Sequence, residues 1–263
     1  MERVVNLIDR QREHFNSIAE RYKTARKGTN HVLLKQLMWT HALGNIDRFR
    51  GRHIDVVEPM CGFGDAKALV ETYLSPDVAY SGYDYSDKVI DLLRQEKPDI
   101  NCWQADATTY ELPAAKYDVV AILGGLHHVP DHATNVVAQA AKALKPGGIF
   151  ISLEPTFGNS LFRKVRETIY ERNTLFDAMT ERTFDVRELF GMFESTGLKP
   201  VKILHPGLLS YVLYYNPDAF PFLNLGGPAF VRAAFGIDKP FFESAIGRRL
   251  SFATLSIWER PPA

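Results

Sequence analysis

The sequence is poor in the features that mark secreted, membrane-spanning or nucleic-acid-binding proteins. Its 263 residues include only two cysteines, Cys61 and Cys102, which argues against a disulfide framework and fits a reducing cytoplasm. The formal net charge is +0, so no partner among nucleic acids is expected. No apolar run approaches the roughly 18 residues of a membrane-spanning helix. The charged start, MERVVNLIDRQRE, lacks the apolar run of a signal peptide. We therefore expect a cytoplasmic protein.

What the sequence does have is enough apolar residues, 46% of the total, for one sizeable domain with a cap. Short strand-like runs alternate with helical patterns of about 10–15 residues, which implies βαβ units and a doubly wound α/β fold with a parallel sheet. Ser86 is a good N-cap for the helix after the second strand, and Asp131 is expected to open the helix after the fourth. The expected strands are 53–58, 79–84, 100–106, 117–123 and 149–154, followed by 198–205 and 248–260.

The segments outside the expected sheet suggest that the chain is divided into a lid, a core and a cap. Helices are expected at 2–26 and 31–44, and again at 159–180 and 185–196. We expect an N-terminal helical lid (1–50), a core (51–205 and 249–263, with lid helices inside 155–198), and a cap insertion (206–248). Because the strand at 198–205 is expected to run parallel to the first five, an insertion after it emerges beside the ligand-binding edge of the sheet.

The glycine-containing stretch EPMCGFGD, residues 58–65, follows the first strand. A dinucleotide site would want G-x-G-x-x-G under a pyrophosphate, but those positions hold Met60, Gly62 and Asp65. S-adenosylmethionine (SAM) carries no phosphate. An acid such as Glu58 can bind its ammonium group, and the turn glycines let the backbone approach its methionine part. The alternative is a plain tight turn between a strand and a helix.

Two further acids end the following strands. Asp84 ends the second strand, where a carboxylate can accept both ribose hydroxyls, and Asp106 ends the third, where it can accept from an adenine amino group. A single such acid is readily explained as a helix cap. Three acids at the carboxyl ends of adjacent parallel strands lie at the edge where open α/β sheets bind ligands. The pattern therefore favours a SAM site over a nicotinamide site.

These blocks resemble class I SAM-dependent methyltransferases, in particular the small-molecule group that includes ubiquinone and menaquinone biosynthesis enzymes. The segments that carry the resemblance are VVEPMCGFGD, GYDYSDKVIDLLRQ, QADATTYELP, YDVVAILGGLHHVPDH and ALKPGGIFISLEP. The resemblance implies a Rossmann-like, seven-stranded, mostly parallel sheet whose last strand is antiparallel. The family more often has glycine at Met60, whose side chain can point away from the ligand. The implied cofactor-binding residues are Tyr22, Glu58, Pro59, Met60, Gly62, Gly64, Asp84, Tyr85, Asp106, Ala107 and Leu123.

The resemblance also places the loop GLHHVPDH beside the transferred methyl group, where His127 or His128 can act as a base. The alternative for each is a structural histidine bonded to the backbone. No metal is expected, because no carboxylate or cysteine at ligand spacing completes a site. Glu154 ends the fifth strand and is assigned to substrate binding, with loop fixing as the alternative. The basic run RKVRETIYER (163–172) can hold an acidic substrate, but a solvated helix face is favoured.

The cap insertion is rich in aromatic side chains. Tyr211, Tyr214 and Tyr215 are assigned to an apolar acceptor pocket, and the phenylalanines Phe220, Phe222, Phe230, Phe235, Phe241 and Phe242 follow them. The alternatives are a small core of the insertion itself, a dimer face, or a patch on a membrane surface. The expected partner is thus a small-molecule acceptor, with a monomer or homodimer and a peripheral membrane contact left open.

The sequence therefore predicts methyl transfer from SAM to a small hydrophobic or aromatic metabolite at oxygen, carbon or nitrogen, with S-adenosylhomocysteine (SAH) as product. In-line displacement depends on holding the nucleophile and the methyl group collinear. A base is needed only for a protonated acceptor. Three alternatives stay open: a non-methylating SAM enzyme such as a cyclase, a non-catalytic SAM-binding protein, and a nicotinamide oxidoreductase.

Overall fold

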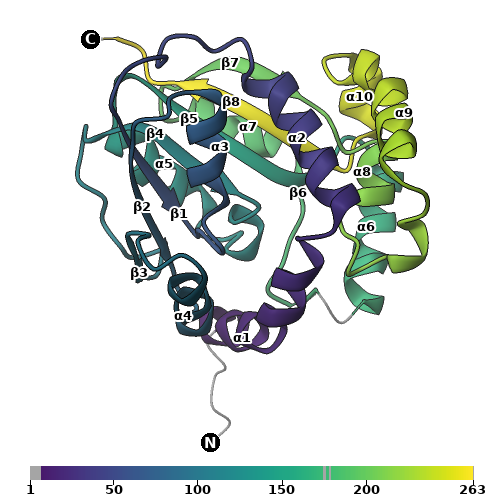
Figure 1. The fold of residues 1–263 in the computed structure, drawn as a ribbon. Coiled ribbons are helices and arrows are strands. Elements are labelled where there is room, and N and C mark those ends of the chain that lie inside the picture. Colours follow the sequence, from purple (N-terminus) through teal and green to yellow (C-terminus); the bar gives the residue numbers. More distant parts are fainter. Residues whose placement is uncertain (1–6, 174–175, 178, 263) are drawn as a thin grey trace, which may run out of the picture.

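The computed structural model describes residues 7–173, 176–177 and 179–262, and its centre is a mixed β-sheet (Figure 1). The strand order is β3-β2-β1-β4-β5-β8-β7. The first five strands pair in parallel, and β8 is antiparallel to both of its neighbours. The expected fold class is therefore confirmed. The strands are β1 (Ile54–Pro59), β2 (Val78–Asp84), β3 (Cys102–Gln104), β4 (Tyr117–Leu123), β5 (Leu144–Phe157), β7 (Lys199–Leu204) and β8 (Ala253–Glu259).

Helices cover both faces of the sheet because adjacent strand residues point to opposite sides. Val56 of β1 belongs to one apolar cluster and its neighbour Val57 to another. The first cluster includes side chains of α2 (Thr29–Leu43), α3 (Asp65–Tyr73) and α4 (Asp87–Glu96). The second includes side chains of α5 (Ala133–Ala143) and α7 (Val186–Glu194). The result is the three-layer arrangement that the alternation of strands and helices predicts.

Several expected boundaries need correction. The helix expected at 159–180 ends early, because α6 spans Ser160–Arg172. The strand expected from 248 begins at Ala253, and the residues before it form α10 (Ala245–Leu250). A two-residue strand, β6 (Phe184–Asp185), pairs with β5 and was not expected.

Helix caps show one expectation met and one missed. The Ser86 hydroxyl accepts from the Val89 amide and so caps α4 as expected. The N-cap position of α5 is His132 rather than Asp131, and its side chain makes no capping hydrogen bond. The first expected helix is present as α1 (Leu7–Ala25), and its expected start at residue 2 lies outside the described residues.

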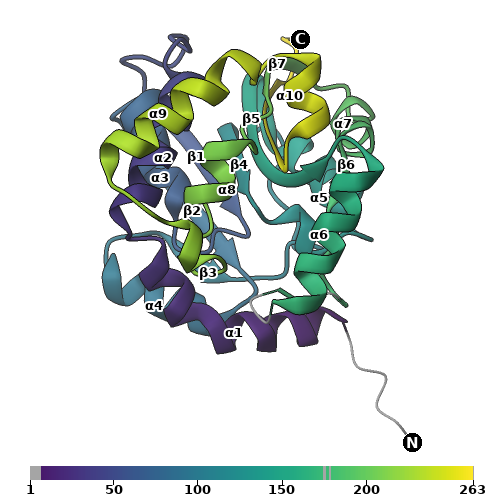
Figure 2. The same cartoon turned by 90° about the vertical axis from the view of Figure 1, so that its right-hand side faces the viewer.

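The cap, residues 206–248, forms short helices on one side of the molecule, where α8, α9 and α10 lie with α6 (Figure 2). Its aromatic side chains divide into two groups. Tyr211, Tyr214, Phe235 and Phe242 join the main apolar cluster together with α2, so they do not form a separate small core. Phe222, Phe230 and Phe241 are exposed. The elements are α8 (Leu209–Tyr214), η2 (Pro221–Leu223), α9 (Pro228–Asp238) and η3 (Lys239–Phe241).

Within the described ranges, none of the helices combines the length and the apolar character needed to cross a bilayer.

Candidate functional site

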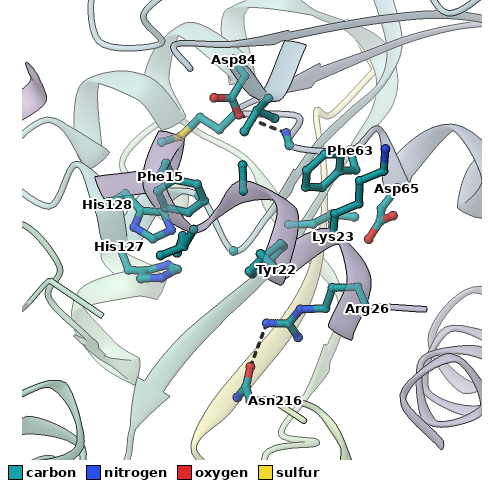
Figure 3. Close-up of a pocket in the computed structure, with 18 of the residues that line it drawn as sticks. Phe15, Tyr22, Lys23, Arg26, Phe63, Asp65, Asp84, His127, His128 and Asn216 are labelled. Carbon is teal, nitrogen blue, oxygen red and sulfur yellow. Dashed lines mark hydrogen bonds between the residues drawn. The ribbon is translucent and has the colours of Figure 1, made fainter. Parts of the chain in front are cut away.

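A cavity of about 260 Å³ lies at the carboxyl ends of β1, β2, β4 and β5. Figure 3 shows side chains of α1 and of the strand ends turned toward it. Phe15, Ile18, Ala19 and Tyr22, the apolar side of the first expected helix, all line this cavity. Residues of α6 and α8 complete the wall. The cavity therefore occupies the edge at which open α/β sheets bind ligands.

The loop after β1 is wound into left-handed conformations. The φ angles of Met60, Gly62 and Gly64 are 56°, 49° and 68°. A Cβ built on Gly62 meets nothing within 4 Å, and this residue lines the cavity, so the missing side chain leaves open space for a ligand. A Cβ on Gly64 would instead lie 2.8 Å from Ile100 Cδ1. Gly64 thus serves core packing, and neither it nor Pro59 is part of the cavity lining.

Met60 occupies a conformation that normally favours glycine. Its side chain does not point away from the cavity, because Met60 lines both the main cavity and a small adjoining one. A Cβ built on Gly125 would lie only 2.9 Å from both Cβ and Sδ of Met60. The thioether therefore packs against the loop after β4 and separates the two cavities.

Glu58 is buried at the end of β1, with 2% of its surface exposed. Both carboxylate oxygens lie 3.2 Å from the amide nitrogen of Ala66 in the first turn of α3, and the Tyr80 hydroxyl donates to Oε2 at 2.5 Å. Burial raises the pKa of Glu58 to about 8, despite these hydrogen bonds. A buried carboxylate at the cavity wall gains most from a cation placed beside it.

Asp84 ends β2 and orders two loops at once. Its Oδ2 accepts from the Gly62 amide and its Oδ1 from the Ser86 amide, each at 3.0 Å. Burial raises the pKa of Asp84, while those amides lower it. Each carboxylate oxygen can accept more than one hydrogen bond. Asp84 therefore keeps capacity for a ligand in the cavity that it lines.

Asp106 lies apart from the other two acids. Its Oδ1 accepts from the amide and the hydroxyl of Thr108, both at 2.8 Å. With Tyr85, Ala107 and Gln11 of α1 it lines the small adjoining cavity. Among the described residues, the buried Tyr85 hydroxyl has no hydrogen-bond partner. Leu123, at the end of β4, lines the main cavity.

Glu154 and His127 form a buried pair at the end of β5. The carboxylate accepts from the amides of Gly125 and Leu126 at 3.0 and 2.9 Å, and it lies 2.9 Å from His127 Nδ1. Burial raises the pKa of Glu154 to about 7. Burial, followed by the charge of His128, holds the pKa of His127 well below its usual range. Glu154 thus fixes the loop after β4, although it also faces the cavity.

His128 has a different carboxylate beside it. Its Nδ1 lies 3.5 Å from Glu181 Oε1 and 2.7 Å from Gln11 Nε2. Burial would raise the pKa of Glu181, but the charge and hydrogen bond of His128 prevail and lower it to about 2. His127, His128 and Glu181 offer ligand atoms within 4.8 Å of one another. The sequence argument that no carboxylate joins the histidines missed Glu181, which lies distant in the chain.

The α1 helix is tied to the segments on either side of the cavity. The Arg26 guanidinium donates to the Tyr215 carbonyl at 2.6 Å and to Asn216 Oδ1 at 3.1 Å. The Tyr22 ring stacks on Phe63 with centroids 6.4 Å apart, and Figure 3 shows both side chains at the cavity. At the other end, Arg10 pairs with Asp177 at 2.6 Å. These contacts hold α1 across the mouth of the cavity.

The cap contributes two of its three assigned tyrosines to the cavity. Tyr211 and Tyr215 stack with centroids 4.3 Å apart and both line it. Tyr214 does not line it, and its hydroxyl donates to the Leu225 carbonyl at 3.2 Å. From α6, Arg166 and Tyr170 also line the cavity. The prediction that the basic side chains of this helix face solvent is therefore wrong for Arg166, which is buried. It is confirmed for Arg163 and Lys164, which are exposed.

The comparisons of this chain with known proteins agree in finding similarity to methyltransferases. Residues 56–148 match the family described as a methyltransferase domain. The demethylmenaquinone methyltransferase of Leptospira interrogans is 27% identical over 150 residues, which are 54% of this chain and 59% of that protein. The chain thus spans under two thirds of the curated relative's length.

Solved structures extend the likeness of fold to nearly the whole chain. A chain of the complex between the Haloferax volcanii Trm112 methyltransferase activator and a methyltransferase superposes with a TM-score of 0.63 at 17% identity, covering 96% of this chain and 98% of that one. The Haemonchus contortus phosphoethanolamine N-methyltransferase 2, in complex with SAM, gives a TM-score of 0.64 at 13% identity and covers 99% of this chain and 61% of that one.

Proposed function

We propose that this protein transfers a methyl group from SAM to a small apolar or aromatic acceptor; the match of residues 56–148 to a methyltransferase-domain family supports this. The observation that carries the proposal is the cavity where the open space over Gly62 meets the buried carboxylates of Glu58 and Asp84. A cofactor with an ammonium group and ribose hydroxyls, and without phosphates, suits that set of acceptors.

Different residues at the strand ends would contact different parts of the cofactor. Asp84 would accept the ribose hydroxyls, and Glu58 would face the ammonium group. Asp106 and Tyr85 would lie on the adenine side of the site, although the small cavity that they line with Ala107, of about 10 Å³, is itself too small for an adenine ring. Lys23 of α1 and Arg26, the residue after this helix, line the main cavity with Gly62 and Phe63 and would supply positive charge for a carboxylate, although Lys23 also pairs with Glu96 at 2.8 Å. When bound, SAM supplies an activated methyl group on a sulfonium.

The chain's own residues contribute positioning and exclusion of water. Tyr211 and Tyr215 form an aromatic wall for the acceptor, and α1 closes over the opposite side. Where the acceptor must lose a proton, His128 is the candidate base, because it lines the cavity and lies 3.5 Å from the Glu181 carboxylate. His127 is held neutral by burial and its role is to keep the loop in place.

The same contacts support a lid. The α1 helix bonds to the cap through Arg26 and to the segment after α6 through Arg10 and Gln11. We propose that these bonds open when a ligand enters or leaves, and we therefore assign α1 and the cap to a gate over the cavity. The division into lid, core and cap, a monomeric or dimeric state, and a membrane-surface contact of the exposed cap remain predictions.

The experiment that tests the proposal is product analysis with SAM and a panel of small aromatic and apolar acceptors. Methylation forms SAH, whereas attack on the aminopropyl chain forms methylthioadenosine and would indicate another SAM chemistry. We expect Asp84→Asn to weaken SAH binding roughly 10- to 150-fold, the equivalent of one lost charge-assisted hydrogen bond. The matched control is Asp91→Asn on the exposed face of α4. Equal SAH affinity in both variants would refute the cofactor assignment.

A further inference from the structure

The cavity contains a buried cation that has no carboxylate partner among the described residues. Arg166 of α6 is 7% exposed and lines the cavity. Its Nη2 donates to the Phe252 carbonyl. Its Nε is buried and has no hydrogen-bond partner in the part of the chain that the structure describes. Across the same ranges, no carboxylate lies within 4.0 Å of its guanidinium, as Arg166 belongs to none of the ion pairs.

A second arginine in the same cavity, Arg26, also has a buried Nε without a hydrogen-bond partner among the described residues, but it has a carboxylate nearby. Arg26 donates to a backbone carbonyl and to Asn216, and it lies 3.8 Å from the Asp218 carboxylate. Arg166 has only one such partner. The rings of Phe252 and Tyr170 lie 5.3 and 5.9 Å from its guanidinium carbon, which provides cation–π attraction but no neutralising charge.

Burying a charge is costly unless it is paired, so an unpaired buried arginine at a cavity wall calls for an anion from outside the chain. Glu154 and Glu181 share the cavity and are each held by other groups, although Glu181 Oε2 is itself buried without a hydrogen-bond partner among the described residues. Glu154 holds the amides of the loop after β4, and Glu181 holds His128 and Gln11. Neither is paired with Arg166.

We propose that Arg166 binds an anionic oxygen of the methyl acceptor, most simply a carboxylate attached to an apolar or aromatic body. This inference rests on the proposed function and narrows its substrate class. The guanidinium presents planar, rigid donors that suit a carboxylate. Tyr170 and Tyr211 line the cavity with it and offer apolar surface for the attached ring. Arg26 and Lys23, which line the cavity beside the glycine loop, already have carboxylates nearby, Asp218 at 3.8 Å and Glu96 at 2.8 Å respectively.

The test is the binding of benzoate and of its uncharged analogue benzamide, measured by calorimetry on the full chain with and without saturating SAH. Wild type is compared with Arg166→Met, Arg166→Lys and the control Arg163→Met, which alters an exposed residue of the same helix. We expect the SAH complex to prefer benzoate over benzamide. Arg166→Met should lose that preference by at least about 10-fold, Arg166→Lys should keep part of it, and Arg163→Met should keep all of it.

The outcomes separate this inference from the proposed function. A wild-type complex that fails to prefer benzoate, or an Arg166→Met variant that retains the preference, would overturn the role of Arg166 while leaving SAH binding intact. Loss of SAH affinity in Arg166→Met would also overturn it, because the arginine would then serve the cofactor. Absence of SAH binding to wild type would instead refute the proposed function. The ratio of the two affinities is unaffected by a purely structural loss of stability.

Discussion

The buried carboxyl group of Glu58 should make the ligand-free protein less stable as the pH rises. Its pKa is about 8 in the folded protein against the ordinary 4.5, so the folded state holds the proton more tightly than the unfolded chain does. Stability contributed by the neutral form is complete below pH 4.5 and is lost as the pH rises through 8. Between pH 5 and pH 8 the two pKa values correspond to a decrease of roughly 3.5 kcal/mol in the free energy of unfolding.

The perturbation that isolates this effect is Glu58→Gln. The amide keeps an acceptor for the Ala66 nitrogen and a polar group facing the Tyr80 hydroxyl, so the shape and hydrogen bonding of the site are largely preserved. Urea unfolding at pH 5, 6, 7 and 8 should give a wild-type free energy that falls relative to the variant by roughly 3.5 kcal/mol over this range. Taking the difference in free energy between wild type and variant cancels the contributions of other titrating groups. Glu154 is one of these, because its raised pKa also makes stability fall as the pH rises.

The control is Glu111→Gln, a carboxyl group that is exposed. Its pH profile should run parallel to that of wild type. If the profile of Glu58→Gln also ran parallel to wild type, Glu58 would not be a desolvated carboxyl, and its role in holding an ammonium group would lose its physical basis.

The remaining predictions concern the cavity. Gly62→Val should weaken SAH binding at least about 10-fold by filling the open space above the loop, and the strain at φ 49° should cost about 1–3 kcal/mol of stability; unchanged SAH affinity in calorimetry would contradict this. Tyr211→Ala should raise the acceptor KM while leaving SAH affinity unchanged, and a fall in SAH affinity alone would assign Tyr211 to the cofactor. Gln11→Ala should accelerate SAH release in stopped-flow fluorescence by loosening α1, whereas an unchanged rate would remove this residue from the gate.

The positions of the acids at the strand ends were predictable from the sequence, because a parallel sheet places the carboxyl ends of its strands at one edge. Once alternating strands and helices imply a parallel sheet, Glu58 and Asp84 must meet at its carboxyl edge. The same reasoning places Asp106 at that edge, but it cannot show that the carboxylate is bonded to its own Thr108 turn. That detail depends on the rotation of one side chain.

Contacts between distant segments could not be predicted in the same way. Arg163 and Arg166 lie in one helical run of the sequence, and only the docking of α6 on the cavity decides that Arg166 is the buried one. Glu181 reaches His128 from a segment beyond α6. Periodicity could have paired Arg166 with Tyr170, since positions four apart share a helix face, but it could not identify what that face meets.

Met60 shows a different limit. The sequence presents it as a missing glycine, while the backbone there adopts the left-handed conformation that glycine favours. The side chain is accommodated because Gly125 leaves room for the thioether, with only 2.9 Å between a built Cβ and Met60 Sδ. The compensating residue lies in the loop after β4, which no local pattern connects to the loop after β1.

The central claim is that SAM binds at the carboxyl edge of the sheet, with its ribose at Asp84 and its ammonium group facing Glu58. A crystal structure of the protein with SAH tests this directly. We predict density in the main cavity, with the ribose hydroxyls within hydrogen-bond distance of Asp84 and the amino group on the Glu58 side of Gly62. Density for SAH elsewhere, or with the ribose away from Asp84, would contradict the account.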